Sequence, residues 1–591
     1  MQVTSLRSAL AACAAAVLVA CADGRTLAKT GVLSVPAGAT QVVEAITTLS
    51  QLNVGPGASL VAPEGSSLTL TVNGVSSPIT PGSFHGTVVL TPTQDVVERF
   101  ADMGVDESYR YRSALFVDNG ARVPAKSVAA AVVGGVVTDR AASDVAITSR
   151  EDKFNGIFVT GDSTYTITNA KINLSGNGGN DFMGFGAAIK TGGKSRVTID
   201  RASIVTSGVV RTAIFVGGDS DVTVNDSNIE VHNGILPADY QGGPITGRGG
   251  VMMEPPWVLG IIGNVRATNV VSNGTVHYNN SHIKAQGWGA LSTDATHDVK
   301  LFATHSVIET VESGYGAYAD GTSLDTFSDC TFNVADYGLI MTGGSGVFTD
   351  GSVVNSRRFG VMMHSGGAGT LSIDKGSVFN TKEAVIQVKS SFPHISVNNA
   401  KLNSANGLII EAIVNDDPHA GAGPGGPGGP GGSGGPGGPG GPGAAGAASS
   451  GPLSISASFS NVELNGDILN AMSTLAGMKI SLDSGSITGA ISTSTAVPAE
   501  GKPTARTFGL IGKMTHTLSP TAAAQGMELV LGSHAAWVVS RTSYLTGLTI
   551  APDARVSAPI GRKVALTVDG KPVPLQAGKY AGALVLVVSA G

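Results

Sequence analysis

One short pattern returns along the chain at a spacing of about 22 to 25 residues. It opens on Asn, Asp, Ser or Thr and closes on an apolar residue a few positions later. It occurs at 168–172, 200–204, 225–229, 279–283, 304–308, 328–332, 350–354, 374–378, 398–402, 460–464 and 483–487. Short polar side chains hydrogen-bond to nearby backbone and thereby fix turns. A repeat of this length, with a strand on each side of its turn, predicts stacked coils.

Four-residue apolar segments precede these turns, as at 188–191 (AIKT), 213–216 (AIFV), 317–320 (AYAD) and 339–342 (LIMT). The second residue of each is bulky and apolar, as expected of a strand residue that points inward. We therefore predict an all-β, single-stranded parallel β-helix, in which each coil stacks on the next at about 4.8 Å. A β-propeller would need about 40 residues per blade, so the spacing excludes it.

The coil period and the polar turn ladder resemble those of right-handed parallel β-helix proteins with the pectin-lyase-like fold. The resemblance covers roughly residues 150–490, and the right-handed sense of the coil is implied by it alone. Segment 537–550 is similar to the final coils of autotransporter passengers. Many proteins of the superfamily bind or cleave polysaccharides and others are adhesins, so the resemblance implies one of these roles.

The two ends of the chain carry a duplicated segment. Residues 62–90 align without gaps with 558–586, and both copies contain a hairpin turn signal, Asn73-Gly74 or Asp569-Gly570. We expect small β-hairpin modules that flank the solenoid, and two roles are open. They either cap the exposed end coils, as solenoids require, or bind glycans.

The expected organisation has eight parts. These are a lipoprotein-type signal peptide (1–20), a linker with short strands (21–61), a hairpin module (62–92), entry or capping coils (93–149), the parallel β-helix (150–415), a Gly/Pro-rich loop (416–452), C-terminal coils (453–556) and a second hairpin module (557–591). Residues 423–442 are almost pure Gly-Gly-Pro. Too few strict triplets are present for a collagen triple helix, so we expect a disordered loop.

The N-terminus predicts export. Arg7 precedes an apolar run from Ala9 to Ala20, which is too short to span a membrane and is typical of a signal peptide. The sequence Leu-Val-Ala-Cys ending at Cys21 resembles a bacterial lipoprotein cleavage box, with Ala22 next to it matching outer-membrane sorting. We expect lipidation of Cys21, which would anchor the protein to the outer membrane or cell surface. The alternative is ordinary signal cleavage nearby, with Cys21 incidental.

One cysteine remains in the body of the protein. Cys330 cannot take part in a disulfide framework or a CxxC metal site. We expect a buried structural thiol. The alternative is a nucleophile paired with His305, at the adjacent turn position one coil earlier.

Charge and composition bear on partners and cofactors. The net charge is −6 over 591 residues and no Lys/Arg-rich run is present, so the sequence lacks the footprint of nucleic-acid binding. We expect a monomer without a cofactor. Two acidic pairs, Asp219 with Asp221 and Asp416 with Asp417, leave a Ca²⁺ site as a weak alternative.

The coil rule fails between the turns at Asn225 and Asn279, which leaves room for a long loop. Aromatic and charged residues gather in this loop and the coils after it, a combination that suits sugar rings. The predicted substrate-binding residues are Arg248, Glu254, Trp257, Trp288, Asp294 and Tyr318. The alternative is that the aromatics fill the solenoid interior, and Tyr318, whose column elsewhere holds Leu, Ile and Met, is the best case for it.

One stacked column suggests catalysis. It contains Thr293, Asp320, Thr342, His364, Val388 and Glu411. Regular stacking would separate Asp320 and His364 by roughly 9 to 10 Å, enough to admit a sugar. The family resemblance implies lyase or epimerase chemistry, which needs a base and a cation for the developing charge. We predict Asp320 or His364 as the base, Tyr315 as the acid and Arg266 as the charge partner. Unpaired, solvent-facing polar residues at a turn are the alternative.

Two functions therefore remain open from the sequence. The first is an exported, surface-anchored enzyme that acts on polysaccharide as a lyase, hydrolase or epimerase. The second is a non-catalytic adhesin or glycan-binding lipoprotein. A cleft with clustered ionisable residues would favour the enzyme, and a flat or ridged face without such a cluster would favour the binding protein.

Overall fold

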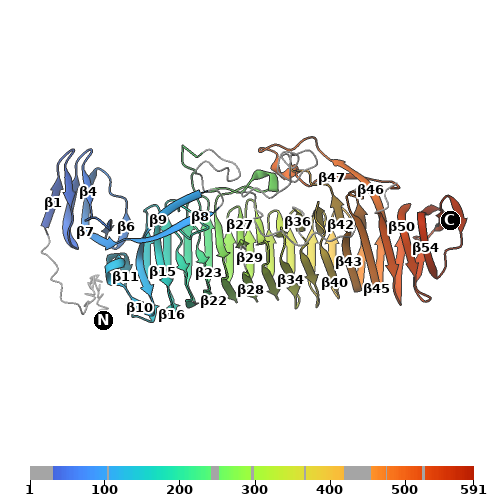
Figure 1. Ribbon diagram of the computed structural model, residues 1–591, viewed down its shortest axis with the longest axis horizontal. Coiled ribbons are helices and arrows are strands. Elements are labelled where there is room, and N and C mark those ends of the chain that lie inside the picture. The colour runs from blue at the N-terminus through green and yellow to red at the C-terminus, as the bar shows by residue number, and fades with distance from the viewer. Residues whose placement is uncertain are drawn as a thin grey trace, which may run out of the picture.

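The protein is a long solenoid built almost entirely of strands (Figure 1). The computed structural model describes residues 31–102, 105–240, 252–294, 298–364, 368–417, 454–473, 475–521 and 526–591. Each regular coil contributes one strand to each of three long sheets, and strands of successive coils pair in parallel. This confirms the predicted all-β parallel solenoid. The hand of the coil stays a prediction.

The three solenoid sheets are numbered here 1 to 3. Sheet 1 contains β14 (Ala146–Ser149), β17 (Lys171–Ser175), β20 (Ser203–Ser207), β23 (Asn228–His232), β26 (His282–Ala285), β29 (Val307–Thr310), β32 (Thr331–Val334), β35 (Val353–Ser356), β38 (Val378–Thr381) and β41 (Lys401–Ser404). Sheet 2 contains β9 (Val105–Asp118), β15 (Phe154–Thr160), β18 (Ile189–Thr191), β21 (Ile214–Val216), β24 (Arg266–Val271), β27 (Gly289–Asp294), β30 (Tyr315–Ala319), β33 (Tyr337–Met341), β36 (Phe359–His364), β39 (Ile386–Lys389), β42 (Leu408–Ile413), β44 (Asp467–Asn470), β46 (Ile491–Pro498) and, antiparallel, β47 (Met514–Leu518). Sheet 3 contains β13 (Ala141–Ser143), β16 (Thr164–Thr168), β19 (Arg196–Asp200), β22 (Asp221–Asn225), β25 (Thr275–Asn279), β28 (Lys300–Thr304), β31 (Leu324–Ser328), β34 (Ser345–Thr349), β37 (Thr370–Ile373), β40 (His394–Asn398), β43 (Ser454–Asn465) and β45 (Gly477–Gly489).

Short elements complete the entry and the connections. They are β8 (Val96–Asp102), β10 (Ala121–Arg122), β11 (Val132–Val133), β12 (Val136–Val137) and the 3-10 turns η1 (Pro124–Lys126), η2 (Ala129–Ala131), η3 (Trp257–Leu259) and η4 (Phe508–Leu510).

The repeated sequence pattern forms the corner between sheet 3 and sheet 1. Its second residue is left-handed in coil after coil, with φ of 52° at Asn169, 50° at Asp226 and 47° at Asn280. Asn and Asp tolerate this conformation better than other non-glycine residues. Their side chains also bond between coils, as when the Asn280 amide donates to the Asp226 carboxylate at 2.6 Å. The opening residue of the pattern also bonds between coils, as when the Asn279 side chain donates to the Asn225 side chain at 2.9 Å, which fits the short polar residues that mark the repeat in the sequence.

The predicted alignment of Asp350, Asp374 and Asn398 at one corner is confirmed, with a shift of one residue. Strands β34, β37 and β40 are neighbours in sheet 3, and Phe348 pairs with Ile373. Asp350, with φ of 53°, therefore occupies the left-handed position of its corner, whereas Asp374 precedes that position.

The third corner residue is small and buried, and it forms a ladder inside the solenoid. The Ser227 hydroxyl accepts a bond from the Ala202 amide at 3.0 Å, and the Ser352 hydroxyl accepts one from the Cys330 amide at 3.1 Å. Burial raises the pKa of the Cys330 thiol to about 11. His305 is exposed and pairs with Asp329. This geometry fits the expected structural role of the Cys330 thiol. In the alternative, His305 would be the base, but it pairs with Asp329.

Sheet 2 separates two hydrophobic cores. The first fills the solenoid, and Ile189, Leu291 and Leu339 point into it. The second lies on the outer face of sheet 2, beneath the β8–β9 hairpin, residues 176–187, residues 252–263 and residues 499–513. These segments lie along one long side of the solenoid (Figure 1).

The sequence alignment of the strands was wrong by one position in part of sheet 2. Leu291 pairs with Ala317, and Ala317 pairs with Leu339, so Tyr318 and Ile340 point away from the interior. A slip of one residue moves a strand side chain to the opposite face. The stacked column is consequently Asp294, Asp320, Thr342, His364 and Lys389, and not the predicted set with Thr293, Val388 and Glu411.

A complete terminal module, longer than the hairpin seen in the sequence, occupies each end. The N-terminal module contains β1 (Gly31–Val35), β2 (Thr40–Val42), β3 (Thr47–Val54), β4 (Ser59–Val61), β5 (Ser66–Val72), β6 (Val75–Ser77) and β7 (Gly82–Gln94). The C-terminal module contains β48 (Met527–Leu531), β49 (Ala535–Val539), β50 (Ser543–Ile550), β51 (Arg555–Ser557), β52 (Arg562–Val568), β53 (Lys571–Val573) and β54 (Gly578–Ala590). All strands but the second of each module have bounds 496 residues apart, as Gly31 is from Met527. The duplication therefore spans the whole of both modules.

Substitution of Asn280 tests the corner. We expect Asn280→Val to destabilise the solenoid by about 1 to 2 kcal/mol, because a β-branched residue is strained at positive φ. Asn280→Gly removes the same amide but tolerates the conformation, so it should lower stability less. Thermal unfolding of both variants checks this, and equal losses would show that the side-chain bond to Asp226 matters and the conformation does not.

Candidate functional site

Most residues predicted for the site converge on the outer face of sheet 2. Arg266, at the start of β24, donates to Asp181 at 2.8 Å and forms an ion pair with Asp294. Its guanidinium lies 5.0 Å from the Phe182 ring centre and 4.7 Å from that of Trp288. The predicted residues Arg266, Asp294 and Trp288 therefore touch, together with Asp181 and Phe182, which the sequence did not point to.

Arg266 is locked in place by this cluster. Only 2% of its surface is exposed. Burial opposes its charge, but Asp181 and Asp294 outweigh that effect and raise its pKa well above the ordinary value. Breaking a buried ion pair by removing one partner typically costs about 3 to 5 kcal/mol. In this geometry Arg266 fastens the segment around Asp181 to sheet 2 and is not open to a polymer.

The two tyrosines of the prediction lie next to this cluster. The Tyr315 hydroxyl is 2.8 Å from the Ser292 hydroxyl, and its ring centre is 5.4 Å from that of Tyr318. Burial raises the pKa of Tyr315 to about 12. Tyr318 belongs to the outer core, so it fills a hydrophobic core as the alternative expected, but not the interior of the solenoid.

Asp320 and His364 lie two coils apart in one column, with Thr342 between them. Asp320 accepts bonds from the Gly321 amide at 2.8 Å and from the Thr342 hydroxyl. Burial, with a further contribution from Asp294, raises the pKa of Asp320 to about 6. Burial lowers the pKa of His364 to about 4. Both side chains are buried, which contradicts the alternative that they face solvent at a turn.

The remaining predicted residues fall in the covering loop or outside the described chain. Trp257 opens η3 and is partly exposed, as is Glu254, whose pKa is raised by burial. Arg248 and Cys21 lie outside the described residues.

Further buried charges, which the sequence did not reveal, hold the covering segments on sheet 2. The Lys389 ammonium lies 2.7 Å from Asp416 and 2.6 Å from Asp417. Asp416 in turn accepts a bond from the Gly512 amide at 2.7 Å. Arg358 donates to the carbonyls of Gly260 at 2.7 Å and Ile511 at 2.5 Å, and so ties two covering segments together. A sequence pattern does not show which charges are buried, so no signal could have found this network.

The acidic pairs considered for Ca²⁺ contact other side chains of the protein. Asp416 and Asp417 share Lys389, and Asp219 accepts a bond from Asn273 at 2.8 Å. The part of the chain that the structure describes contains no group of three or more His, Cys, Asp or Glu side chains placed to hold a metal ion.

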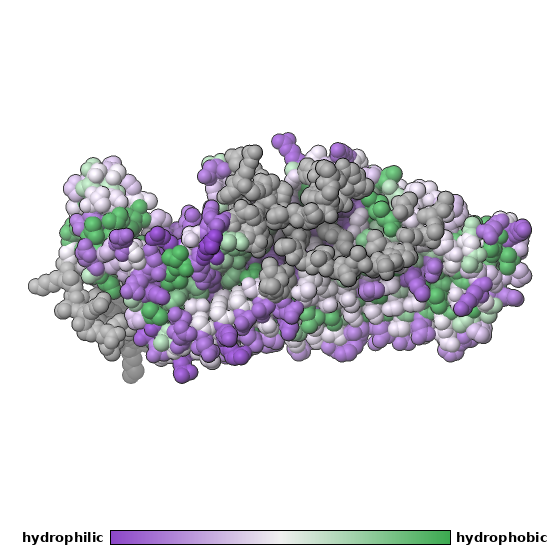
Figure 2. Space-filling view, viewed as in Figure 1, coloured by the Kyte–Doolittle hydropathy of each residue, from purple (hydrophilic) through white to green (hydrophobic). Residues whose placement is uncertain are grey.

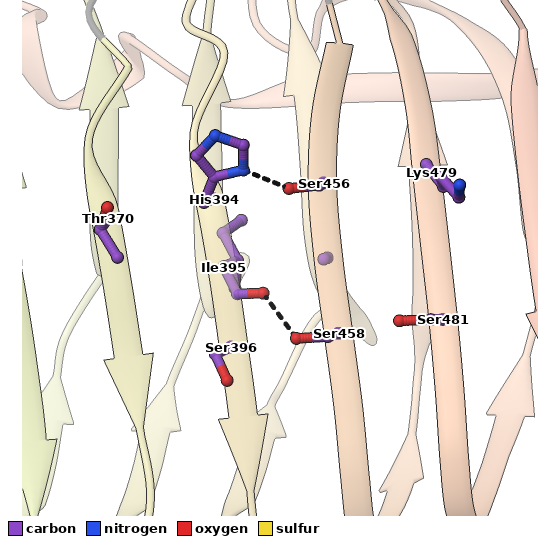
Figure 3. A pocket seen from close by; sticks show the side chains of 9 residues that line it. Thr370, His394, Ile395, Ser396, Ser456, Ser458, Lys479 and Ser481 are labelled. Carbon is purple, nitrogen blue, oxygen red and sulfur yellow. Dashed lines mark hydrogen bonds between the residues drawn. The ribbon is translucent and has the colours of Figure 1, made fainter.

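A shallow groove lies elsewhere, on the outer face of sheet 3 (Figure 3). It has a volume of about 370 Å³ and crosses β37, β40, β43 and β45. Its polar lining consists of Thr370, His394, Ser396, Ser456, Ser458, Lys479 and Ser481. The strand spacing of about 4.8 Å repeats these groups regularly along the solenoid axis. Hydrophilic residues run along the lower edge of the molecule in Figure 2, where Figure 1 places strands of this sheet.

The groove offers exposed hydrogen-bonding groups. His394 Nδ1 is 2.6 Å from the Ser456 hydroxyl, and the Ser458 hydroxyl donates to the Ile395 carbonyl at 3.3 Å. His394 and Lys479 are exposed at the surface. The lining contains no carboxylate. Such a surface can bind a polar polymer, and its lining lacks the paired carboxylates of a glycoside hydrolase site.

The chain has no match among known family models or among the curated proteins compared with it. In the described residues no helix has both the length and the apolar character needed to cross a membrane.

Titration of Asp320 and His364 should change stability in opposite directions. In the folded protein Asp320 holds its proton up to about pH 6, whereas the unfolded chain releases it near 3.8. Asp320 therefore makes stability fall as pH rises from about 4 to 6, by roughly 3 kcal/mol at most. His364 is neutral when folded above about pH 4 and charged when unfolded up to about 6.5, so it makes stability rise over the same range.

Thermal midpoints of two variants between pH 4 and 6.5 check these signs. Relative to the unaltered protein, Asp320→Asn should gain stability as pH rises, and His364→Gln should lose it. Parallel pH profiles for all three proteins would contradict the assigned protonation states.

Proposed function

We propose that the protein is an exported, surface-anchored β-helix protein that binds polysaccharide without cleaving it. The observation that carries this proposal is the groove on sheet 3. It presents hydroxyl groups, one imidazole and one ammonium over four neighbouring coils. A polymer with repeated hydroxyl groups can bond to equivalent side chains on successive coils, which a small ligand cannot do.

The predicted catalytic residues support binding over catalysis. Arg266 and Tyr315 are buried and held by neighbouring side chains, so neither is presented to a polymer in this conformation. The face expected to carry the site is covered by other segments of the chain. The exposed polar groove lies on a different sheet, away from this cluster.

The anchoring part of the proposal rests on the N-terminus. The apolar run and Cys21 resemble a lipoprotein signal, and the first described strand begins at Gly31. A lipid on Cys21 would hold the solenoid at a membrane surface through its N-terminal module. The proposed ligand is then a polysaccharide at that surface.

A polysaccharide-active enzyme is the second candidate, and one observation favours it. The Asp320 carboxyl has a pKa of about 6 and lies in the column of Asp294, whose charge contributes to this shift. Carboxylic acids with raised pKa values act as general acids in glycosidases. In this candidate the covering segments would have to expose the column to a substrate.

Groove variants test the binding proposal. We expect His394→Gln combined with Lys479→Gln to weaken polysaccharide binding at least about tenfold, or roughly 1.4 kcal/mol, because the imidazole ring and the ammonium charge are both lost. Lys401→Gln, in β41 of sheet 1, is the matched control and should bind as the unaltered protein does. Titration against neutral and uronic-acid-containing polymers measures the effect. Equal binding by groove variant and control would contradict the assignment of the groove.

The same polymers separate the two candidates. The binding protein should leave them intact. A rise in absorbance from unsaturated ends, or in reducing ends, that disappears in Asp320→Asn would instead support the enzyme.

A further inference from the structure

The duplicated modules show the same unit in two settings. In the C-terminal module, β48 and β49 stack in parallel on β45, with Met478 opposite Met527 and Gly485 opposite Ala535. In the N-terminal module, the equivalent strands β1 and β2 pair only with β3 and β4 among the described strands. The C-terminal module therefore shows which backbone groups the N-terminal module would use if another coil stacked on β1 and β2.

A proline replaces one of these groups at the N-terminal end. In the C-terminal module, the Gly532 amide donates to the Leu482 carbonyl of β45 at 2.8 Å. The equivalent residue of the N-terminal module is Pro36, which has no N–H to donate. The bond that joins a coil to the paired copy therefore cannot form at the free copy.

At the opposite edge of the module, a proline of one copy again replaces a residue that has a backbone N–H in the other copy. In the N-terminal module, β6 pairs in parallel with β14, and the Ser76 carbonyl accepts from the Arg150 amide at 2.8 Å. The N–H of Ser76 points to the same side as its carbonyl, toward β14. The equivalent residue of the C-terminal module is Pro572, exposed in β53, which pairs with only β52 among the described strands.

We infer that Pro36 and Pro572 block the two ends of the solenoid and keep it from joining end to end with a second copy. Each proline stands in the copy whose edge pairs with no further strand among the described residues, at the position of a backbone N–H that faces the adjoining coil in the other copy. Proline on an exposed edge strand is a known device against pairing between sheets. The modules thus end the solenoid by removing donors as well as by covering the core.

The partner that is kept away is another molecule of this chain. Both edges accept coils of this same protein in the paired copies, β45 at one and β14 at the other. On its other edge, where none of the described strands pairs with it, β1 is otherwise suited to pairing, since its residues are uncharged and Val32 is 62% exposed. A solenoid with two such open ends would be expected to form chains.

Exchange of each proline for the residue of the other copy tests the inference. The variants are Pro36→Gly, as at Gly532, Pro572→Ser, as at Ser76, and the two combined. The matched control is Pro81→Ala, since Pro81 is also a proline of one copy only, with Ala577 as its equivalent, but it lies between strands. Sedimentation velocity over a range of concentrations gives the association state, and thermal unfolding confirms that each variant folds.

We expect the unaltered protein and the control to sediment as monomers. The double variant should associate, with a dissociation constant at least tenfold lower than that of the unaltered protein. Electron micrographs of the double variant should show particles joined end to end. A folded double variant that stays monomeric over the same concentrations would overturn the inference. Association side by side would also overturn it, as would end-to-end association of the unaltered protein.

Discussion

Each coil of the solenoid stacks on the next in one register, and the remaining features depend on this constraint. A parallel ladder joins equivalent residues of successive coils, so one requirement at one position is repeated throughout the chain. At the corner the requirement is a left-handed residue followed by a small buried one. Because the same register sets the outward faces, it also turns single side chains into columns along the axis.

The outward-facing side chains of sheets 2 and 3 have different surroundings. Sheet 2 is covered by its own insertions, and its ionisable side chains are used to hold them, as Lys389 holds Asp416 and Asp417. Sheet 3 leaves hydroxyl and basic groups at the surface. The ionisable side chains predicted to be catalytic therefore lie on sheet 2, where covering segments of the same chain are held. The groups exposed to a polymer on sheet 3 are hydroxyl and basic side chains.

The sequence was informative wherever the backbone restricts the residue type. A short polar residue opens the corner pattern of coil after coil, so the stacking of the coils and the positions of their turns could be predicted. It was less informative in sheet 2, where both faces are buried and carry apolar residues, because alternation then disappears. Tyr318 and Leu291 could not be told apart by face for this reason. The covering of Arg266 and Asp320 depends on distant segments, which no local pattern encodes.

The site was therefore predicted only in part. Trp288, Asp294, Tyr315 and Tyr318 do gather around Arg266, but in a buried cluster. The groove on sheet 3 has no local signal, since its Ser, Thr, Lys and His residues are ordinary on an exposed strand face. Only the stacking of four coils makes them one surface.

Hydroxyl-radical footprinting with and without bound polysaccharide tests the central claim most directly. This measurement reports which side chains a ligand shields, and His394 and Trp257 provide reactive probes on the two competing faces. The account predicts that the polymer protects His394 in the groove and leaves Trp257 unchanged. Protection of Trp257 with His394 unchanged would place the ligand on the covered face and contradict the account.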